Sequence, residues 1–163
     1  MLRSLVLLLF LLSTSPLFAQ SWEKRFGLRF GIAQYEAEGF RIDTKVTAPV
    51  FGGDFWLRRG RVALDLGVDG YQIKTAGSFI NASADVQFLL GSADGPQFGI
   101  GVGPNMSSAD GDIDFTFVPT VTFHIPAGRQ QVYVVGRHHT SSANIDGDAK
   151  TTIFMAGVRF ARW

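Results

Sequence analysis

A short polar segment near the C-terminus carries the residue types that could do chemistry. Residues 137–145 read Arg-His-His-Thr-Ser-Ser-Ala-Asn-Ile and contain His139 and Ser141 two positions apart. In a β-strand such positions share one face, with Cα atoms about 6.7 Å apart, so an imidazole can reach a hydroxyl. A histidine that accepts the proton of a serine makes an activated nucleophile for acyl transfer. The spacing alone also fits a polar strand end that becomes a turn.

The first 19 residues have the composition of a secretory signal peptide. Arg3 supplies a positive start, Leu5–Leu12 is an unbroken apolar run, and small or polar residues lead to Ala19. The run is shorter than the roughly 20 residues that cross a bilayer as a helix. We therefore expect cleavage after Ala19 and one mature domain over residues 20–163.

The composition of that domain excludes several classes of protein. Arg3 is the only one of the 15 basic residues in the leader, so the mature chain has as many basic as acidic residues. This balance gives no case for nucleic-acid binding. The chain has no cysteine, which excludes a lipid-anchored lipoprotein and a disulfide framework. His124 with scattered aspartates is no metal signature, and we expect neither metal nor cofactor.

The mature chain alternates between large apolar residues and small or polar ones, which is the period of a β-strand. In residues 26–33, for example, Phe, Leu and Ile share one face, while Gly, Ala and Arg29 share the other. The pattern predicts eight strands. Six are regular and two are less so, at about residues 26–33, 62–69, 80–88, 98–103, 114–125 and 154–160, and at 50–57 and 131–141.

The polar faces of these strands favour an inside-out arrangement. They are rich in glycine and carry charges of both signs, at Arg29, Asp65, Asp69, Asp85 and Arg159, as expected of the narrow interior of an eight-stranded closed barrel. A soluble sandwich would bury the large apolar face instead. We predict an all-β fold, an eight-stranded antiparallel transmembrane β-barrel in the cell outer membrane. In it, Arg29 and Arg159 would pair with lumenal carboxylates. The alternative with the inner and outer faces reversed is a soluble barrel that binds a small apolar ligand.

Short and long connections alternate between the predicted strands, so they fall at opposite ends of the barrel. The short ones contain glycine or proline and are typical of periplasmic turns: residues 58–61, 91–96 and 126–130. The longer or more polar ones alternate with them and would be external loops: residues 36–49, 107–112 and 142–150. Odd strands then run outward, so the seventh strand would end at the cell surface.

The seventh strand also resembles a known family. A signal peptide, a small eight-stranded barrel and the pattern His-x-Ser-x-Ala-x-aliphatic at His139, Ser141, Ala143 and Ile145 are similar to the lipid A deacylases (lipid A 3-O-deacylase, acyloxyacyl hydrolase-like). The resemblance implies that Ser141 is the nucleophile and His139 the general base. The substrate would be an ester-linked acyl chain of lipid A, in the lipopolysaccharide of the outer leaflet, and no metal or cofactor would be needed.

The third catalytic group of that family is not matched by residue type. The family places an acidic residue, usually Glu, near the start of the last strand, where it orients the histidine. Thr152 matches this position by its distance from the C-terminus. Asp148 in the preceding loop is our candidate in its place, and Asp146 is the other carboxylate nearby. The family also has Asn where this chain has Ser142.

The face of the seventh strand decides what its histidine and serine would meet. We expect them to face lipid together with Tyr133, Val135 and Arg137, because tyrosine and a long arginine suit the membrane interface. If the segment is only a strand end, the alternative is a noncatalytic small outer-membrane barrel with a structural or surface-interaction role.

Overall fold

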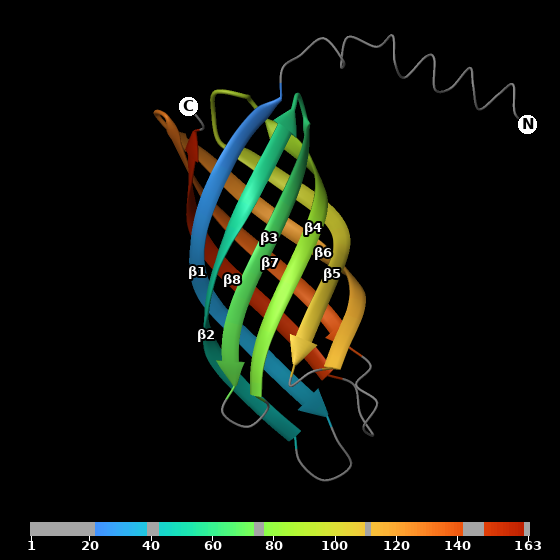
Figure 1. The fold of residues 1–163 in the computed structure, drawn as a ribbon. Coiled ribbons are helices and arrows are strands. Elements are labelled where there is room, and N and C mark those ends of the chain that lie inside the picture. Colours follow the sequence, from blue (N-terminus) through green and yellow to red (C-terminus); the bar gives the residue numbers. More distant parts are fainter. Residues whose placement is uncertain (1–21, 39–42, 74–76, 110–111, 142–148, 162–163) are drawn as a thin grey trace, which may run out of the picture.

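The described residues form eight β-strands closed into a barrel (Figure 1). The computed structural model describes residues 22–38, 43–73, 77–109, 112–141 and 149–161. Consecutive strands pair antiparallel, and β1 pairs with β8 to close the ring, which confirms the predicted fold. The strands are β1 Glu23–Glu38, β2 Asp43–Arg59, β3 Val62–Ile73, β4 Gly77–Gly91, β5 Gln97–Ala109, β6 Asp112–Ala127, β7 Gln130–Ser141 and β8 Ala149–Ala161. The predicted leader, residues 1–19, lies outside the described residues.

The period of two in the sequence becomes two faces of the barrel wall. In β1, Phe30 is 64% exposed while its neighbour Arg29 is 2% exposed. The other strands repeat the contrast, with large apolar side chains outside and polar or small ones inside. An apolar belt of this kind is stable only against lipid, and sheets cross a membrane only when closure removes their edges. The chain is therefore a transmembrane barrel, and the expected location in the cell outer membrane agrees with this belt. Among the described residues, no helix is long and apolar enough to cross a membrane.

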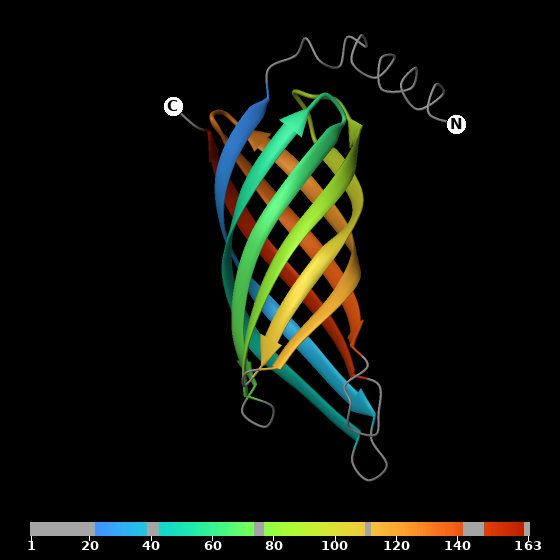
Figure 2. The ribbon, with the colours of Figure 1, turned by 45° about the vertical axis from the view of Figure 1, so that its right-hand side comes forward.

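Tight turns join the strands at one end of the barrel, where the sequence predicts them. They connect β2 to β3, β4 to β5, and β6 to β7. Gly60 and Gly128 in two of these turns have φ angles of 59° and 64°, which glycine adopts without a steric penalty. The start of β1 and the end of β8 lie at the same end (Figure 2). Short turns mark the periplasmic side of such barrels.

The opposite end differs from the prediction. The sequence predicts external loops at residues 36–49 and 107–112, but β1, β2, β5 and β6 continue as paired strand into both. In the first, Glu36 and Lys45 form an ion pair across the two strands, with Nζ 2.6 Å from Oε1. The β1–β2 hairpin therefore projects beyond the neighbouring strands at the outer end (Figure 2).

Strand pairing is interrupted where prolines occur. The β2–β3 pairing stops at Val50, next to Pro49, and the β6–β7 pairing stops at Thr120, next to Pro119. The β4–β5 ladder skips two positions beside Pro104. Proline has no N–H to donate to a neighbouring strand, so these residues account for the interruptions. The turn end of the barrel is thus paired more completely than the outer end.

Side chains fill the lumen, as expected for eight strands. Toward the outer end they form an apolar cluster that includes Val50, Tyr71 and Met155. A smaller apolar group that includes Trp56 and Leu89 packs toward the turns. Between the two lie buried arginines and aspartates. Glycines on the inner face of the wall make room for the large lumenal side chains.

Candidate functional site

Arg29 forms the first of three arginine-centred clusters in the middle of the lumen. Its Nε and Nη2 donate to the two carboxylate oxygens of Asp69, at 2.5 and 2.7 Å. Its Nη1 lies 3.7 Å from Asp65 Oδ1. A Cβ on Gly67 would fall on this guanidinium, so the strand needs glycine at that point. The lumenal pairing predicted for Arg29 is confirmed.

Arg159 is the centre of the second cluster and has no exposed surface. It donates from Nε to Asp54 Oδ2 and from Nη2 to Asp65 Oδ2, both at 2.5 Å. Its guanidinium carbon stands 3.9 Å from the ring centre of Tyr133, and the Tyr133 hydroxyl donates to Asp54. The pairing predicted for Arg159 is confirmed, although the sequence pattern did not identify Asp54 as a partner.

Arg137 completes the network and corrects the prediction for β7. It donates from Nη1 to Asp69 Oδ2 at 3.1 Å and from Nη2 to Asp85 Oδ2 at 2.7 Å. The side chains of Tyr133, Val135 and Arg137 are 1%, 0% and 4% exposed, so they point into the lumen and not toward lipid. The expectation that they face the membrane is wrong. Its guanidinium pairs with carboxylates of β3 and β4 on the other side of the lumen.

A chain of hydrogen bonds runs from Arg159 through the buried His124 and returns to Asp65, which Arg159 also binds directly. Arg159 can only donate, so its contact of 3.2 Å makes His124 Nδ1 the acceptor and places the proton on Nε2. Nε2 then donates to the Thr122 hydroxyl at 2.8 Å, and Thr122 donates to Gln87 Oε1 at 3.1 Å. Gln87 Nε2 completes the chain to Asp65 at 3.3 Å. His124 is thus held as a neutral structural residue.

The lumenal network is suited to holding the barrel wall together. Three arginines face four aspartates across the lumen, and the ion pairs join strands β1, β2, β3, β4, β7 and β8. Among the residues that the structure describes, no group of three or more His, Cys, Asp or Glu is placed to bind a metal ion.

The predicted catalytic residues lie at the outer end of β7. The backbone of His139 is paired opposite Thr151, and that of Ser141 opposite Ala149. Both therefore belong to the strand. Positions 137, 139 and 141 share one face by the period of two, and Arg137 points into the lumen, so the expectation that His139 and Ser141 face lipid loses its support. Their side-chain contacts stay a prediction. Asp148, the predicted third group, lies outside the described residues.

Thr152, which matches the position of the family's acidic residue, contacts a different histidine. It is paired opposite His138, and its hydroxyl lies 2.9 Å from His138 Nδ1 on the outer face. The motif of the seventh strand gives no role to His138. The cross-strand register of β7 and β8 is the signal that would have identified the pair.

The chain is similar to several proteins of known structure. Neisserial surface protein A matches with a TM-score of 0.54 and 14% identity, over 84% of this chain and 97% of that one. Ail of Yersinia pestis matches with a TM-score of 0.46 and 14% identity, over 85% and 99%. The N-terminal β-barrel domain of Pseudomonas aeruginosa OprF matches with a TM-score of 0.49 and 14% identity, over 82% and 96%. Neither a protein-family model nor a curated protein sequence matches the chain.

Proposed function

We propose that this protein is a noncatalytic small outer-membrane barrel with a structural and surface-interaction role. The observation that carries the proposal is the lumen, whose middle is occupied by ion-paired side chains such as Arg29 and Arg159. An interior filled in this way leaves no room there for a pore or a substrate. Interaction with other molecules then falls to the two ends and the outer surface of the barrel.

The outer end has a feature suited to such a role. The β1–β2 hairpin continues past the apolar belt as paired strand and carries the Glu36–Lys45 ion pair on its outside. A paired hairpin is more ordered than a loop of the same length, so it loses less conformational entropy when it binds a partner.

Complementation of a deletion strain tests the noncatalytic role. The expressed barrel should limit entry of a hydrophobic dye through the outer membrane, and Ser141→Ala and His139→Ala should restore this as fully as the wild type. Purified protein should also give no conductance steps in planar bilayers. Failure of Ser141→Ala to complement, in a correctly inserted barrel, would overturn the proposal.

Hydrolysis of an ester-linked acyl chain of lipid A is the second candidate function. Its support is the position of His139 and Ser141 at the outer end of β7, the side where lipopolysaccharide would be the partner and substrate. Because Arg137 on the same strand face points into the lumen, the proposal requires lipid A to reach the pair over the outer rim of the barrel. In this proposal Ser141 is the nucleophile, His139 the general base and Asp148 the group that orients the histidine. No metal or cofactor takes part.

Mass spectrometry of lipid A from expressing cells tests the esterase. Activity would appear as the loss of one acyl chain with the wild type, and Ser141→Ala and His139→Ala should each abolish it to a similar extent, because such residues act as a unit. Asp148→Asn should lower the activity, whereas Thr152→Glu should raise it. Unchanged lipid A with both wild type and Thr152→Glu would reject the esterase.

A further inference from the structure

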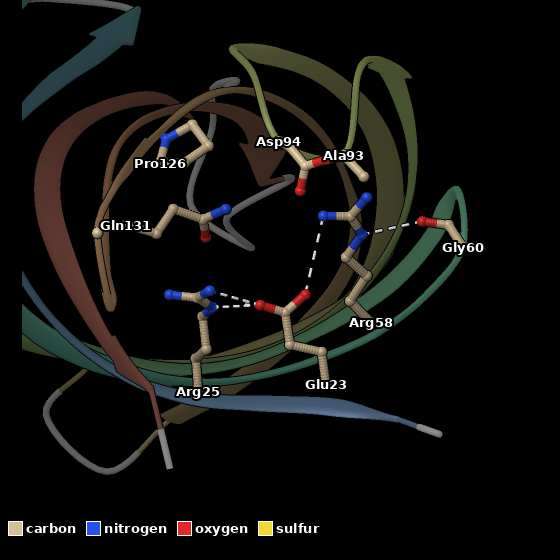
Figure 3. A pocket seen from close by; sticks show the side chains of 9 residues that line it. Glu23, Arg25, Arg58, Gly60, Ala93, Asp94, Pro126 and Gln131 are labelled. Carbon is tan, nitrogen blue, oxygen red and sulfur yellow. Dashed lines mark hydrogen bonds and ion pairs between the residues drawn. The ribbon is translucent and has the colours of Figure 1, made fainter. Parts of the chain in front are cut away.

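The turn end of the barrel holds a polar cavity of about 590 Å³ (Figure 3). Its walls come from β1, β2, the β4–β5 turn and the β6–β7 turn, and they include Arg25, Arg58, Asp94 and Gln131. The volume lies within the usual range of about 300–1,000 Å³ for ligand sites. It lies on the periplasmic side of the lumenal ion pairs, so it is separate from both functions considered above.

The charged side chains that line this cavity are Arg25, Arg58, Glu23 and the exposed Asp94 of the β4–β5 turn, and Glu23 lies between the two arginines. Glu23 Oε1 accepts from Arg25 Nε at 2.6 Å and lies 2.5 Å from Arg25 Nη2. Glu23 Oε2 lies 3.8 Å from Arg58 Nη1, which is beyond hydrogen-bond distance. Both arginine side chains are largely shielded from solvent, at 15% and 11% exposure, while Glu23 is 38% exposed.

The arginines are also fixed in place from behind. Arg58 Nε donates to the carbonyl of Gly60 at 2.9 Å, and Arg25 Nη1 donates to the carbonyl of Arg129 at 3.2 Å. Figure 3 shows both guanidinium groups turned toward the same space, with Glu23 between them. Guanidinium groups fixed by the backbone bind a planar carboxylate with little loss of side-chain freedom.

The barrel wall around the cavity is closed to the membrane. At this end the β4–β5 and β6–β7 pairs run to the last residues of their strands, Gly91 with Gln97 and Ala127 with Gln130. β1 is paired with β8 from Arg25 onward, and beyond the β3–β4 pairs the backbone N–H of Leu89 donates to the carbonyl of Arg61. A phospholipid could not bring its head group here without drawing its acyl chains through a paired sheet. The ligand must therefore come from the aqueous periplasm through the mouth of the barrel.

From this geometry we propose that the cavity binds a carboxylate group of a soluble acidic ligand from the periplasm. The side chain of Glu23 occupies the carboxylate position in the free protein, and the ligand displaces it. The two oxygens of the incoming carboxylate accept hydrogen bonds from Arg25 and Arg58. Gln131, which is 3% exposed and lines the same space, is placed to contact the rest of the ligand.

Calorimetric titration of the full mature chain in octyl glucoside, a detergent without phosphate, tests this site. The probes are an acetylated triglutamate amide, succinate and inorganic phosphate. Arg58→Gln and Arg25→Gln should weaken binding of the triglutamate at least about tenfold, as expected for loss of charged hydrogen bonds. Glu23→Gln should strengthen binding at least about threefold, because the competing carboxylate is gone.

The controls separate a built site from general attraction to basic turns. Arg61→Gln removes an exposed arginine of the β2–β3 turn that does not line the cavity, and it should leave affinity unchanged. Each variant is first checked for folding by its shift on gels when boiled. Triglutamate binding tighter than succinate identifies a peptide as the source of the carboxylate, and equal affinity identifies a small acid. The proposal is overturned if Glu23→Gln binds no tighter than wild type, if Arg61→Gln weakens binding as much as Arg58→Gln, or if phosphate binds as well as the carboxylates.

Discussion

Replacing Arg159 with leucine should destabilise the barrel more than any surface change. The guanidinium is fully buried and holds Asp54 and Asp65, each at 2.5 Å. Its removal leaves these two carboxylates without their main partner, and losing one member of a buried pair costs about 3–5 kcal/mol. The stacking on Tyr133 is lost as well and adds roughly 1–2 kcal/mol. We expect a total loss of about 4–7 kcal/mol in the free energy of unfolding.

Urea unfolding in lipid vesicles, followed by tryptophan fluorescence, measures this loss. With a slope of about 2 kcal/mol per molar urea, the midpoint for Arg159→Leu should fall by about 2–3.5 M. Adding Asp54→Asn should recover part of the loss, because it neutralises one of the two uncompensated carboxylates. Arg61→Leu, on an exposed turn, is the control and should change the free energy by less than about 0.5 kcal/mol. A midpoint for Arg159→Leu equal to that of Arg61→Leu would refute the argument that the buried charges hold the barrel.

Two further predictions concern a lumenal glycine and the outer hairpin. Gly157→Ala should lower stability by about 1–3 kcal/mol, because its Cβ would lie 2.6 Å from the Tyr133 ring. Gly70→Ala is the control and should leave stability unchanged, because its Cβ would have no atom nearer than 3.9 Å. The temperature at which each variant loses its gel shift measures the difference. The hydrogen bond to Lys45 keeps the pKa of Glu36 below its usual range, so this pair is intact above the unfolded pKa and is lost as pH falls through the lowered value. Lys45→Ala should raise the Glu36 midpoint in an NMR titration while leaving thermal stability nearly unchanged, since the pair is exposed.

The alternation of residues was enough to predict most of the wall and part of the lumen. Arg29, Arg159 and His124 each sit between large apolar neighbours in their strands, so their inward position could be read from the period of two. The same rule gives no answer for Val132–Val135, where apolar residues occupy both faces. In β7 the inward face is identified by Arg137, whose guanidinium donates to the lumenal Asp69 and Asp85.

The ends of the strands were harder to predict, because outside the membrane the outer face need not be apolar and the alternation of apolar and polar residues is lost. Beyond the belt, β1 and β2 carry polar residues such as Glu36 and Lys45, which are also typical of loops. Only the cross-strand pairing shows that the segment is extended. For the candidate catalytic pair, sequence gives the residue types, while the register adds the partner of each backbone position and the contact of Thr152 with His138.

The β2–β3 pairing stops next to Pro49 and the β6–β7 pairing stops next to Pro119, which divides the barrel into two parts with different tolerance to change. Backbone amides on the turn side of these residues are held in continuous ladders, whereas those beyond them depend on fewer neighbours and should exchange their hydrogens with solvent sooner. Insertions on the outer side then disturb no ion pair in the lumen. Surface segments at the outer end can therefore vary during evolution, or carry inserted foreign peptides, without a change in the transmembrane part of the barrel.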